Sequence, residues 1–206
     1  MSTRRTLAVV TAGLSQPSST RLLADRLAGA AADELRAAGH EVDVEVVELR
    51  EHAHAIVDAM LTRFPAGDLA DALDTVTNAD GLVLVSPLFT TTYSGLFKSF
   101  LDIVDPDALT GTPVLLGATG GTARHSLALD YSMRPLLTYL RAQVVPTAVF
   151  AATDDWAGQD DDGALPRRIA RAGRELAEAV GARPAAGPQD DPFGDTPDFA
   201  ELLGGS

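Results

Sequence analysis

The chain has 206 residues, a length that suits one compact domain and a tail. Its 16 lysine and arginine residues face 29 aspartate and glutamate residues, and the resulting formal charge of −13 repels nucleic acids and anionic membranes. The absence of cysteine excludes disulfides, thiolate metal sites and cysteine nucleophiles. An anionic ligand must therefore be held by local groups, against the field of the whole chain.

No segment is predicted to cross a membrane. The longest charge-free stretch, 81–97, contains Pro87 and several hydroxyl side chains, which do not suit a spanning helix. The apolar run after Arg4 and Arg5 is short and predicts a first strand rather than a signal peptide. We therefore expect a cytoplasmic protein that binds neither nucleic acid nor membrane.

Short apolar runs alternate with longer helical patterns along the chain. In chain order they predict a strand at 7–10, a helix at 18–38, a strand at 42–46, a helical region at 51–77, a strand at 82–85, a helix at 94–104, a strand at 114–116, a helix at 127–140, a strand at 144–150 and a helix at 165–180. Pro135 is expected to kink its helix, because proline cannot donate a backbone hydrogen bond.

This alternation predicts an α/β fold with a parallel sheet. The second strand alternates valine with acidic residues and Pro146 interrupts the fifth, and both features are typical of sheet edges. We therefore predict a flavodoxin-like three-layer sandwich with a five-stranded parallel sheet in the order 2-1-3-4-5. The domain is expected to cover residues 1–181, and the Pro-, Gly- and Asp-rich segment 182–206 to form a flexible acidic tail.

Hydroxyl side chains gather in the loops after the first, third and fourth predicted strands. In the predicted strand order these loops share the sheet edge where ligands bind. They contain Thr11, Ser15, Ser18, Ser19 and Thr20; Ser86, Thr90, Thr91, Thr92, Tyr93 and Ser94; and Thr119 and Thr122. One edge of the sheet is thus expected to offer uncharged hydrogen-bond donors to a ligand.

The first of these loops, 13–21, runs directly into a predicted helix, where backbone N–H groups and the helix dipole favour a phosphate. Arg21 is an available positive charge. The alternative is that Ser18 merely caps the helix. Neither a GxGxxG nor a GxxxxGK[ST] motif is present, which argues against a Rossmann dehydrogenase and a P-loop nucleotidase. A pocket for one phosphate that is lined by hydroxyl groups suits FMN better than ATP.

Three motifs together resemble a known family. They are the segment from Ser86-Pro-Leu-Phe to Tyr93-Ser-Gly-Leu-Phe-Lys98, the loop Ala118-Thr-Gly-Gly-Thr122, and the stretch from His125 to Arg134-Pro135. Over about residues 6–180 the chain resembles the NAD(P)H-dependent FMN reductases, especially those that supply reduced flavin to two-component monooxygenases. The resemblance implies FMN and NADPH or NADH as cofactors, a monooxygenase as a possible partner, and a homodimer or homotetramer with Tyr131 near a subunit contact.

The resemblance also implies roles for site residues. The FMN phosphate would be surrounded by Ser15, Gln16, Ser18, Ser19 and Thr20; the ribityl chain and ring would be held by Pro87, Leu88, Phe89, Thr90 and Tyr93; and Thr119, Gly120 and Gly121 would pass under the isoalloxazine. Many members have Ser-Pro-Arg where this chain has Leu14-Ser15-Gln16, so an arginine contact to the phosphate requires Arg21 as a substitute. No catalytic side chain is expected, because hydride transfer to flavin needs none.

Several alternatives remain open at this point. The acceptor could be a quinone or azo dye, the protein could be a flavodoxin-type electron carrier, or it could bind a phospho-ligand without flavin. Phe89 and Tyr93 could equally be core aromatics, and His125 is read as a packing or capping residue in preference to a nicotinamide contact. His52 and His54 are two residues apart on a predicted helix and should not share a metal. Trp156 and the acidic loop 154–162 are interpreted as solvated surface.

Overall fold

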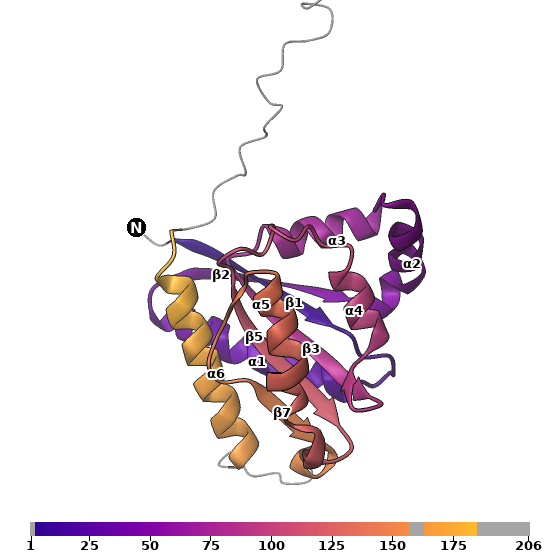
Figure 1. The fold of residues 1–206 in the computed structure, drawn as a ribbon. Helices are drawn as coiled ribbons and strands as arrows, with labels where there is room; N and C mark the ends of the chain where they lie inside the picture. Colours follow the sequence, from indigo (N-terminus) through magenta and orange to yellow (C-terminus); the bar gives the residue numbers. More distant parts are fainter. Residues whose placement is uncertain (1–2, 157–162, 185–206) are drawn as a thin grey trace, which may run out of the picture.

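The computed structural model describes residues 3–156 and 163–184, which form a central sheet with helices on both faces (Figure 1). Its strands are β1 (Arg4–Thr11), β2 (Glu41–Glu48), β3 (Gly81–Phe89), β4 (Thr92–Tyr93), β5 (Pro113–Gly120), β6 (Gln143–Val144) and β7 (Val149–Ala152). They are ordered β2-β1-β3-β5-β6, while β4 pairs with β3 and β7 pairs with β5. All pairs are parallel except β3 with β4.

The predicted fold class is confirmed, and the strand count and order need two corrections. The described residues form seven strands rather than five. The predicted fifth strand is divided into β6 and β7 on either side of Pro146, because proline lacks the N–H that a continuous ladder requires. The short strand β4 returns antiparallel on the end of β3, so the sheet is not purely parallel.

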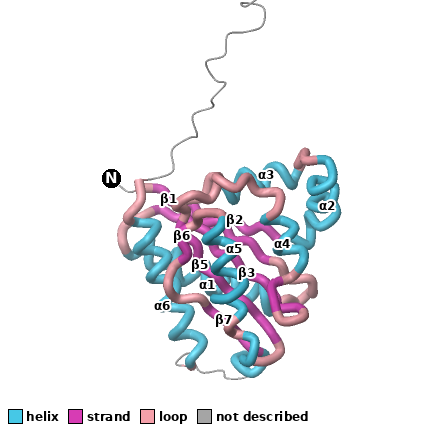
Figure 2. Tube along the Cα trace, in the orientation of Figure 1, coloured by secondary structure: helices cyan, strands magenta, loops and turns pink. Residues whose placement is uncertain are grey.

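The sheet lies between two layers of helices (Figure 2). Alternate residues of its buried strands pack against one layer or the other. On β1, Leu7 and Val9 join a core with α1 (Ser19–Ala37) and α6 (Ala164–Gly181). Ala8 and Val10 point to the other face. That face is covered by α2 (Ala53–Thr62), α3 (Asp68–Thr77), α4 (Gly95–Leu101) and α5 (Arg134–Tyr139). The period-2 alternation therefore fixes which strand side chains enter each layer.

Three predicted helices differ in their bounds. The region 51–77 contains a 3-10 helix (Leu49–His52) followed by α2 and α3. The helix predicted at 94–104 ends earlier, with Asp102 as its C-cap. The helix predicted at 127–140 begins as a π-helix, Leu129–Met133, and continues as α5, an irregularity that coincides with Pro135 and its missing N–H.

The last predicted helix agrees with α6 to within one residue at each end. Most of the predicted tail, residues 185–206, lies outside the described residues. None of the helices in residues 3–156 and 163–184 combines the length and apolarity needed to cross a membrane.

Helices α1 and α6 pack closely together at Gly173. A Cβ at this position would lie 2.7 Å from the Ala30 Cβ and 2.8 Å from the Ala30 carbonyl carbon. Backbone atoms of α1 cannot move aside cheaply, so only glycine fits here. By contrast, a Cβ at Gly29 of α1 would meet no atom within 4 Å.

These two glycines predict opposite effects of the same substitution. Gly173→Ala is expected to lower the free energy of unfolding by about 2 kcal/mol through overpacking. Gly29→Ala should raise it by about 0.5–1 kcal/mol, because alanine loses less backbone entropy in a helix. Urea unfolding followed by circular dichroism measures both. Equal stability of the two variants would contradict the close packing of α1 and α6.

Candidate functional site

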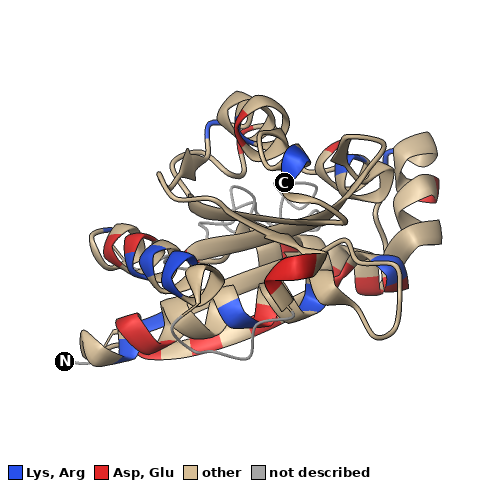
Figure 3. Ribbon diagram, turned by 90° about the horizontal axis from the view of Figure 1, so that it is seen from below, with Lys and Arg blue, Asp and Glu red and all other residues tan. Residues whose placement is uncertain are grey.

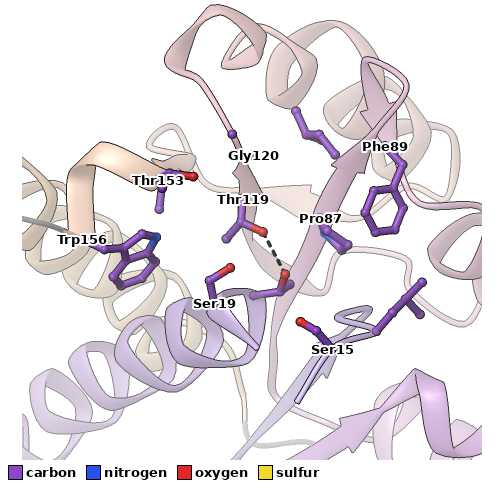
Figure 4. Close-up of a pocket in the computed structure, with 13 residues that line it drawn as sticks. Ser15, Ser19, Pro87, Phe89, Thr119, Gly120, Thr153 and Trp156 are labelled. Atoms are coloured by element: carbon purple, nitrogen blue, oxygen red, sulfur yellow. Dashed lines mark hydrogen bonds between the residues drawn. The ribbon is translucent and has the colours of Figure 1, made fainter. Parts of the chain in front are cut away.

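A cavity of about 460 Å³ opens at the carboxyl ends of the parallel strands (Figure 4). The loop after β1, the end of β3 itself, and the segments where β5 and β7 end all contribute to its walls. Its lining residues are Leu14, Ser15, Ser19, Thr20, Pro87, Leu88, Phe89, Thr119, Gly120, Gly121, Ala151, Thr153 and Trp156. The cavity therefore lies at the edge of the sheet where the sequence places a ligand.

Nine of the thirteen predicted site residues line this cavity. They are Ser15, Ser19, Thr20, Pro87, Leu88, Phe89, Thr119, Gly120 and Gly121. The structure does not bring the other four to the cavity wall, namely Gln16, Ser18, Thr90 and Tyr93.

Ser18 is the N-cap of α1. Its Oγ accepts a hydrogen bond from the backbone N–H of Arg21 at 3.2 Å, which satisfies one donor of the first helical turn. Ser18 therefore fulfils the capping role considered as the alternative. The next two residues, Ser19 and Thr20, begin the helix and line the cavity. The amino end of α1 is thus directed to the cavity.

A buried hydrogen bond joins the start of α1 to the end of β5. The hydroxyl oxygens of Thr20 and Thr119 lie 2.8 Å apart, and the two residues are 3% and 5% exposed (Figure 4). This bond connects two residues that lie 99 positions apart in the chain. It fixes the floor of the cavity between Ser19 on one side and Gly120 on the other.

The loop after β3 is closed by two serines. Ser86 is fully buried, accepts a hydrogen bond from the Ser94 N–H at 2.9 Å and donates to the Pro87 carbonyl oxygen at 2.9 Å. Ser94 caps α4 by accepting from the Phe97 N–H. The ring centroids of Tyr93 and Phe97 lie 5.9 Å apart, which agrees with the alternative that Tyr93 is a core aromatic.

A tight turn at the tip of this loop holds Phe89 at the cavity. Thr90 and Thr91 connect β3 to β4 with φ angles of 49° and 76°. Such a turn usually contains asparagine or glycine, because β-branched residues rarely adopt the left-handed region. The Phe89 side chain before the turn is 48% exposed and lines the cavity. Thr90 therefore shapes the loop without lining the cavity.

One wall of the cavity, formed at and after the end of β7, is not predicted from the sequence. Ala151, Thr153 and Trp156 line the cavity, and Thr153 and Trp156 lie on the side opposite Phe89 (Figure 4). Trp156 also packs against the core beneath α1, and the Arg26 guanidinium carbon lies 5.2 Å from its ring centroid. The interpretation of Trp156 as solvated surface is therefore wrong. Because β7 ends at the same sheet edge, a tryptophan shortly after it was the available signal.

The charged residues near the first loop are already paired. Strands β3, β5 and β7 contain no charged residue, whereas acidic and basic residues occur on the surrounding helices (Figure 3). Arg21 donates to Asp25 at 2.7 Å and also to Glu48. Arg50 donates to the second carboxylate oxygen of Glu48 at 2.7 Å. Arg21 is therefore not a free charge at the cavity.

These pairs shift the ionisation of the groups involved. Burial raises the pKa of Glu48, but hydrogen bonds from Arg50 and Arg21 outweigh it and hold the pKa below its usual value. The hydrogen bond that Arg21 donates to Asp25 contributes most to raising the pKa of Arg21. Glu48 is therefore a carboxylate near neutral pH, and its negative charge lies beside the start of the first loop, where Glu48 pairs with Thr11.

The histidines do not assemble a metal site. His125 is exposed at the end of a 3-10 helix, Ala123–His125, and His52 and His54 lie on successive elements. Among residues 3–156 and 163–184, no three acidic or histidine side chains are grouped as metal ligands.

Gly13 provides the space for the cap of α1, which predicts a further substitution effect. A Cβ at Gly13 would lie 2.2 Å from the Ser18 Oγ. Gly13→Ala is therefore expected to displace this oxygen and lower the free energy of unfolding by about 1–2 kcal/mol. Ser18→Ala, which removes the cap without a clash, should reproduce most of the loss. Gly95→Ala is the control, because its Cβ would meet nothing within 4 Å. Unaltered thermal unfolding of Gly13→Ala would contradict this role.

Known proteins share both the sequence and the fold of this chain. It is 34% identical over 186 residues to the NADH-dependent FMN reductase SfnE of Pseudomonas putida, a match that covers 90% of this chain and 97% of the relative. It is 38% identical over 148 residues to an FMN reductase (NADPH) of Pseudomonas aeruginosa, covering 71% and 76% of the two chains. Both relatives are aligned over most of their length.

Solved structures extend this similarity. An oxidoreductase from Corynebacterium diphtheriae superimposes with a TM-score of 0.85 and 48% identity, covering 89% of this chain and all of the other. An apo NADH:FMN oxidoreductase, EmoB, superimposes with a TM-score of 0.73 and 26% identity, covering 88% and 93%. Residues 5–157 match the family described as NADPH-dependent FMN reductase. The chain therefore belongs to the NADPH-dependent FMN reductase family.

Proposed function

We propose that this protein is an NAD(P)H:FMN oxidoreductase that binds FMN in the cavity at the carboxyl ends of β1, β3 and β5. The observation that carries the proposal is the convergence of three separate loops, each with residues that the family resemblance assigns to FMN, on this one cavity. Family membership supports the reaction, and the cavity supports the place where it occurs.

The residues of the cavity fit FMN in size and chemistry. The volume of about 460 Å³ lies in the usual range for small-molecule sites. At one side, Ser15, Ser19 and the amino end of α1 offer neutral donors that suit a phosphate. At the other side, Phe89 offers an apolar surface and Gly121 offers backbone without a side chain, and both suit a flat ring.

The chain contributes binding and orientation to this reaction. When bound, FMN supplies the ring that accepts hydride from the nicotinamide. Ser15, Ser19 and Thr20 would hold the phosphate end, while Pro87, Leu88 and Phe89 would cover part of the ring and exclude water. The mechanism requires no acid, base or nucleophile from the protein, which agrees with a cavity that no titratable side chain lines.

Reduced FMN is proposed to leave as the product and to serve a two-component monooxygenase. We also place the enzyme in the cytoplasm, where reduced nicotinamide nucleotides are available. The catalytic domain is proposed to end with α6 at Gly181, and the chain from 182 onward to begin the tail. At the start of that segment, the Arg183 carbonyl oxygen accepts a hydrogen bond from the buried Arg5 at 2.6 Å.

An anaerobic absorbance experiment tests the activity. The purified protein mixed with excess FMN is expected to bleach the oxidised flavin spectrum when NADPH or NADH is added. Catalytic bleaching of free FMN distinguishes a flavin reductase from a flavodoxin, which would not be reduced by either nucleotide. Quinones and azo dyes, tested as alternative acceptors at equal concentration, should turn over more slowly than FMN. Faster turnover of a quinone or dye would instead favour the quinone or azo reductase.

We further propose that the enzyme is a homo-oligomer and that a second copy covers the π-helix and α5. Leu127, Tyr131 and Tyr139 are 62%, 78% and 79% exposed along this segment. The Tyr131 N–H donates to the Leu127 carbonyl oxygen at 3.0 Å, so these two side chains lie one turn apart. Large apolar side chains exposed together are typical of subunit interfaces.

Light scattering coupled to size-exclusion chromatography tests this interface. The double variant Leu127→Ser/Tyr131→Ser is expected to elute as a smaller assembly than the wild type, because it removes apolar area from the contact. Leu61→Ser is the matched control, since Leu61 is 80% exposed on α2, a different element. If only the control Leu61→Ser forms a smaller assembly, the interface lies on α2 instead.

A further inference from the structure

A single carboxylate engages both arginines beside the first loop. The Arg50 Nε donates to Oε2 of Glu48 at 2.7 Å, and the Arg21 Nη1 donates to Oε1. The side chains of Glu48 and Arg50 are each 22% exposed, so the group is only partly solvated. Asp25 and Glu51 add further carboxylates to Arg21 and Arg50. Two cations thus face three anions, and the cluster carries a net negative charge.

This cluster borders the loop to which the FMN phosphate is assigned. Glu48 ends β2 directly beside Thr11, the last residue of β1 before the loop. Arg21 lies in the first turn of α1, next to the cavity residue Thr20. With the Gln16 amide oxygen turned toward the guanidinium, Gln16 accepts a hydrogen bond from the Arg50 Nη1 at 2.7 Å. The two arginines are therefore near the loop, yet neither lines the cavity.

Arginine is the side chain best suited to bind a phosphate, because its planar guanidinium forms two parallel charge-assisted hydrogen bonds. Here the donors of Arg21 and Arg50 already bond to carboxylates. The phosphate end of the cavity is left with the neutral donors Ser15, Ser19 and Thr20. Neutral hydrogen bonds are about half as strong as charge-assisted ones.

We propose that Glu48 limits the affinity of this enzyme for FMN by holding Arg21 and Arg50 away from the phosphate and adding its own negative charge beside it. The inference rests on the proposed function and deepens it, since modest affinity allows the flavin to leave as a product. Glu48 therefore lowers the affinity for FMN through the contacts of the phosphate and not through those of the ring.

The substitution Glu48→Gln tests this role by flavin fluorescence quenching. It removes one negative charge and weakens the hold on both arginines, so the Kd for FMN should fall by roughly tenfold. The Kd for riboflavin, which lacks the phosphate, should not change. Glu45→Gln is the matched control, because Glu45 lies three residues earlier on β2 and contacts Thr75 instead. It removes the same charge and should leave both Kd values near those of the wild type.

A second variant tests whether the gain in FMN affinity comes from the released arginines or from the loss of one negative charge. Glu48→Gln/Arg50→Gln should lose most of the gain in FMN affinity, because one released guanidinium is gone. The gain in Glu48→Gln should also shrink in high salt, which screens the contact to the phosphate. Thermal unfolding of each variant shows whether it is folded.

The possible results are distinct. An unchanged or weaker affinity of folded Glu48→Gln for FMN overturns the inference, as does an equal gain for riboflavin or for Glu45→Gln. These results leave the proposed function intact, because the wild type would still bind and reduce FMN. A wild type that neither binds FMN nor reduces it with NADPH or NADH overturns the proposed function, and the inference with it.

Discussion

The hydrogen-bond register of β1, β3 and β5 determines where three walls of the cavity lie, and the pairing of β7 with β5 places the fourth. Thr11 pairs with Val85, and Pro87 pairs with Thr119, so the three strands end within a few residues of one another. Their loops then start from the same edge of the sheet, as the parallel arrangement requires. The buried bond between Thr20 and Thr119 links the start of α1 to the end of β5. A shift of one residue in either strand pair would point these side chains to the opposite face.

This arrangement also solves the electrostatic problem set by a chain of net charge −13. A phosphate approaching the cavity meets hydroxyl groups and the amino end of α1 rather than free cations. Such donors are fixed in place by the fold, so they need little reorganisation when the anion arrives. Long-range repulsion by the acidic surface is screened beyond about 8 Å at physiological salt, and the local donors then dominate.

The sequence was sufficient for the parts of the fold that follow from local pattern. Apolar runs such as Leu7–Val10 identified the buried strands, and Pro146 marked the break that divides β6 from β7. The loops of the cavity were predicted because hydroxyls and glycines gather after particular strands. The sequence allows a capping role for Ser18, and the bond that its Oγ accepts from the Arg21 N–H shows that the serine caps α1. The wall at Trp156 was missed because one aromatic residue among acidic neighbours has no periodic pattern, and only the end of β7 reveals its direction.

The pairing of Arg21 with Asp25 and Glu48 could not be predicted from the sequence either, and it removes Arg21 as a free charge at the cavity. From composition alone, an arginine in the first turn of a phosphate-binding helix is an obvious ligand. The fold instead brings Glu48 from the neighbouring strand to that arginine, through a contact between residues 27 positions apart. An enzyme that must release its flavin gains from such an arrangement, because tight binding would lower the free energy of the complex without accelerating hydride transfer.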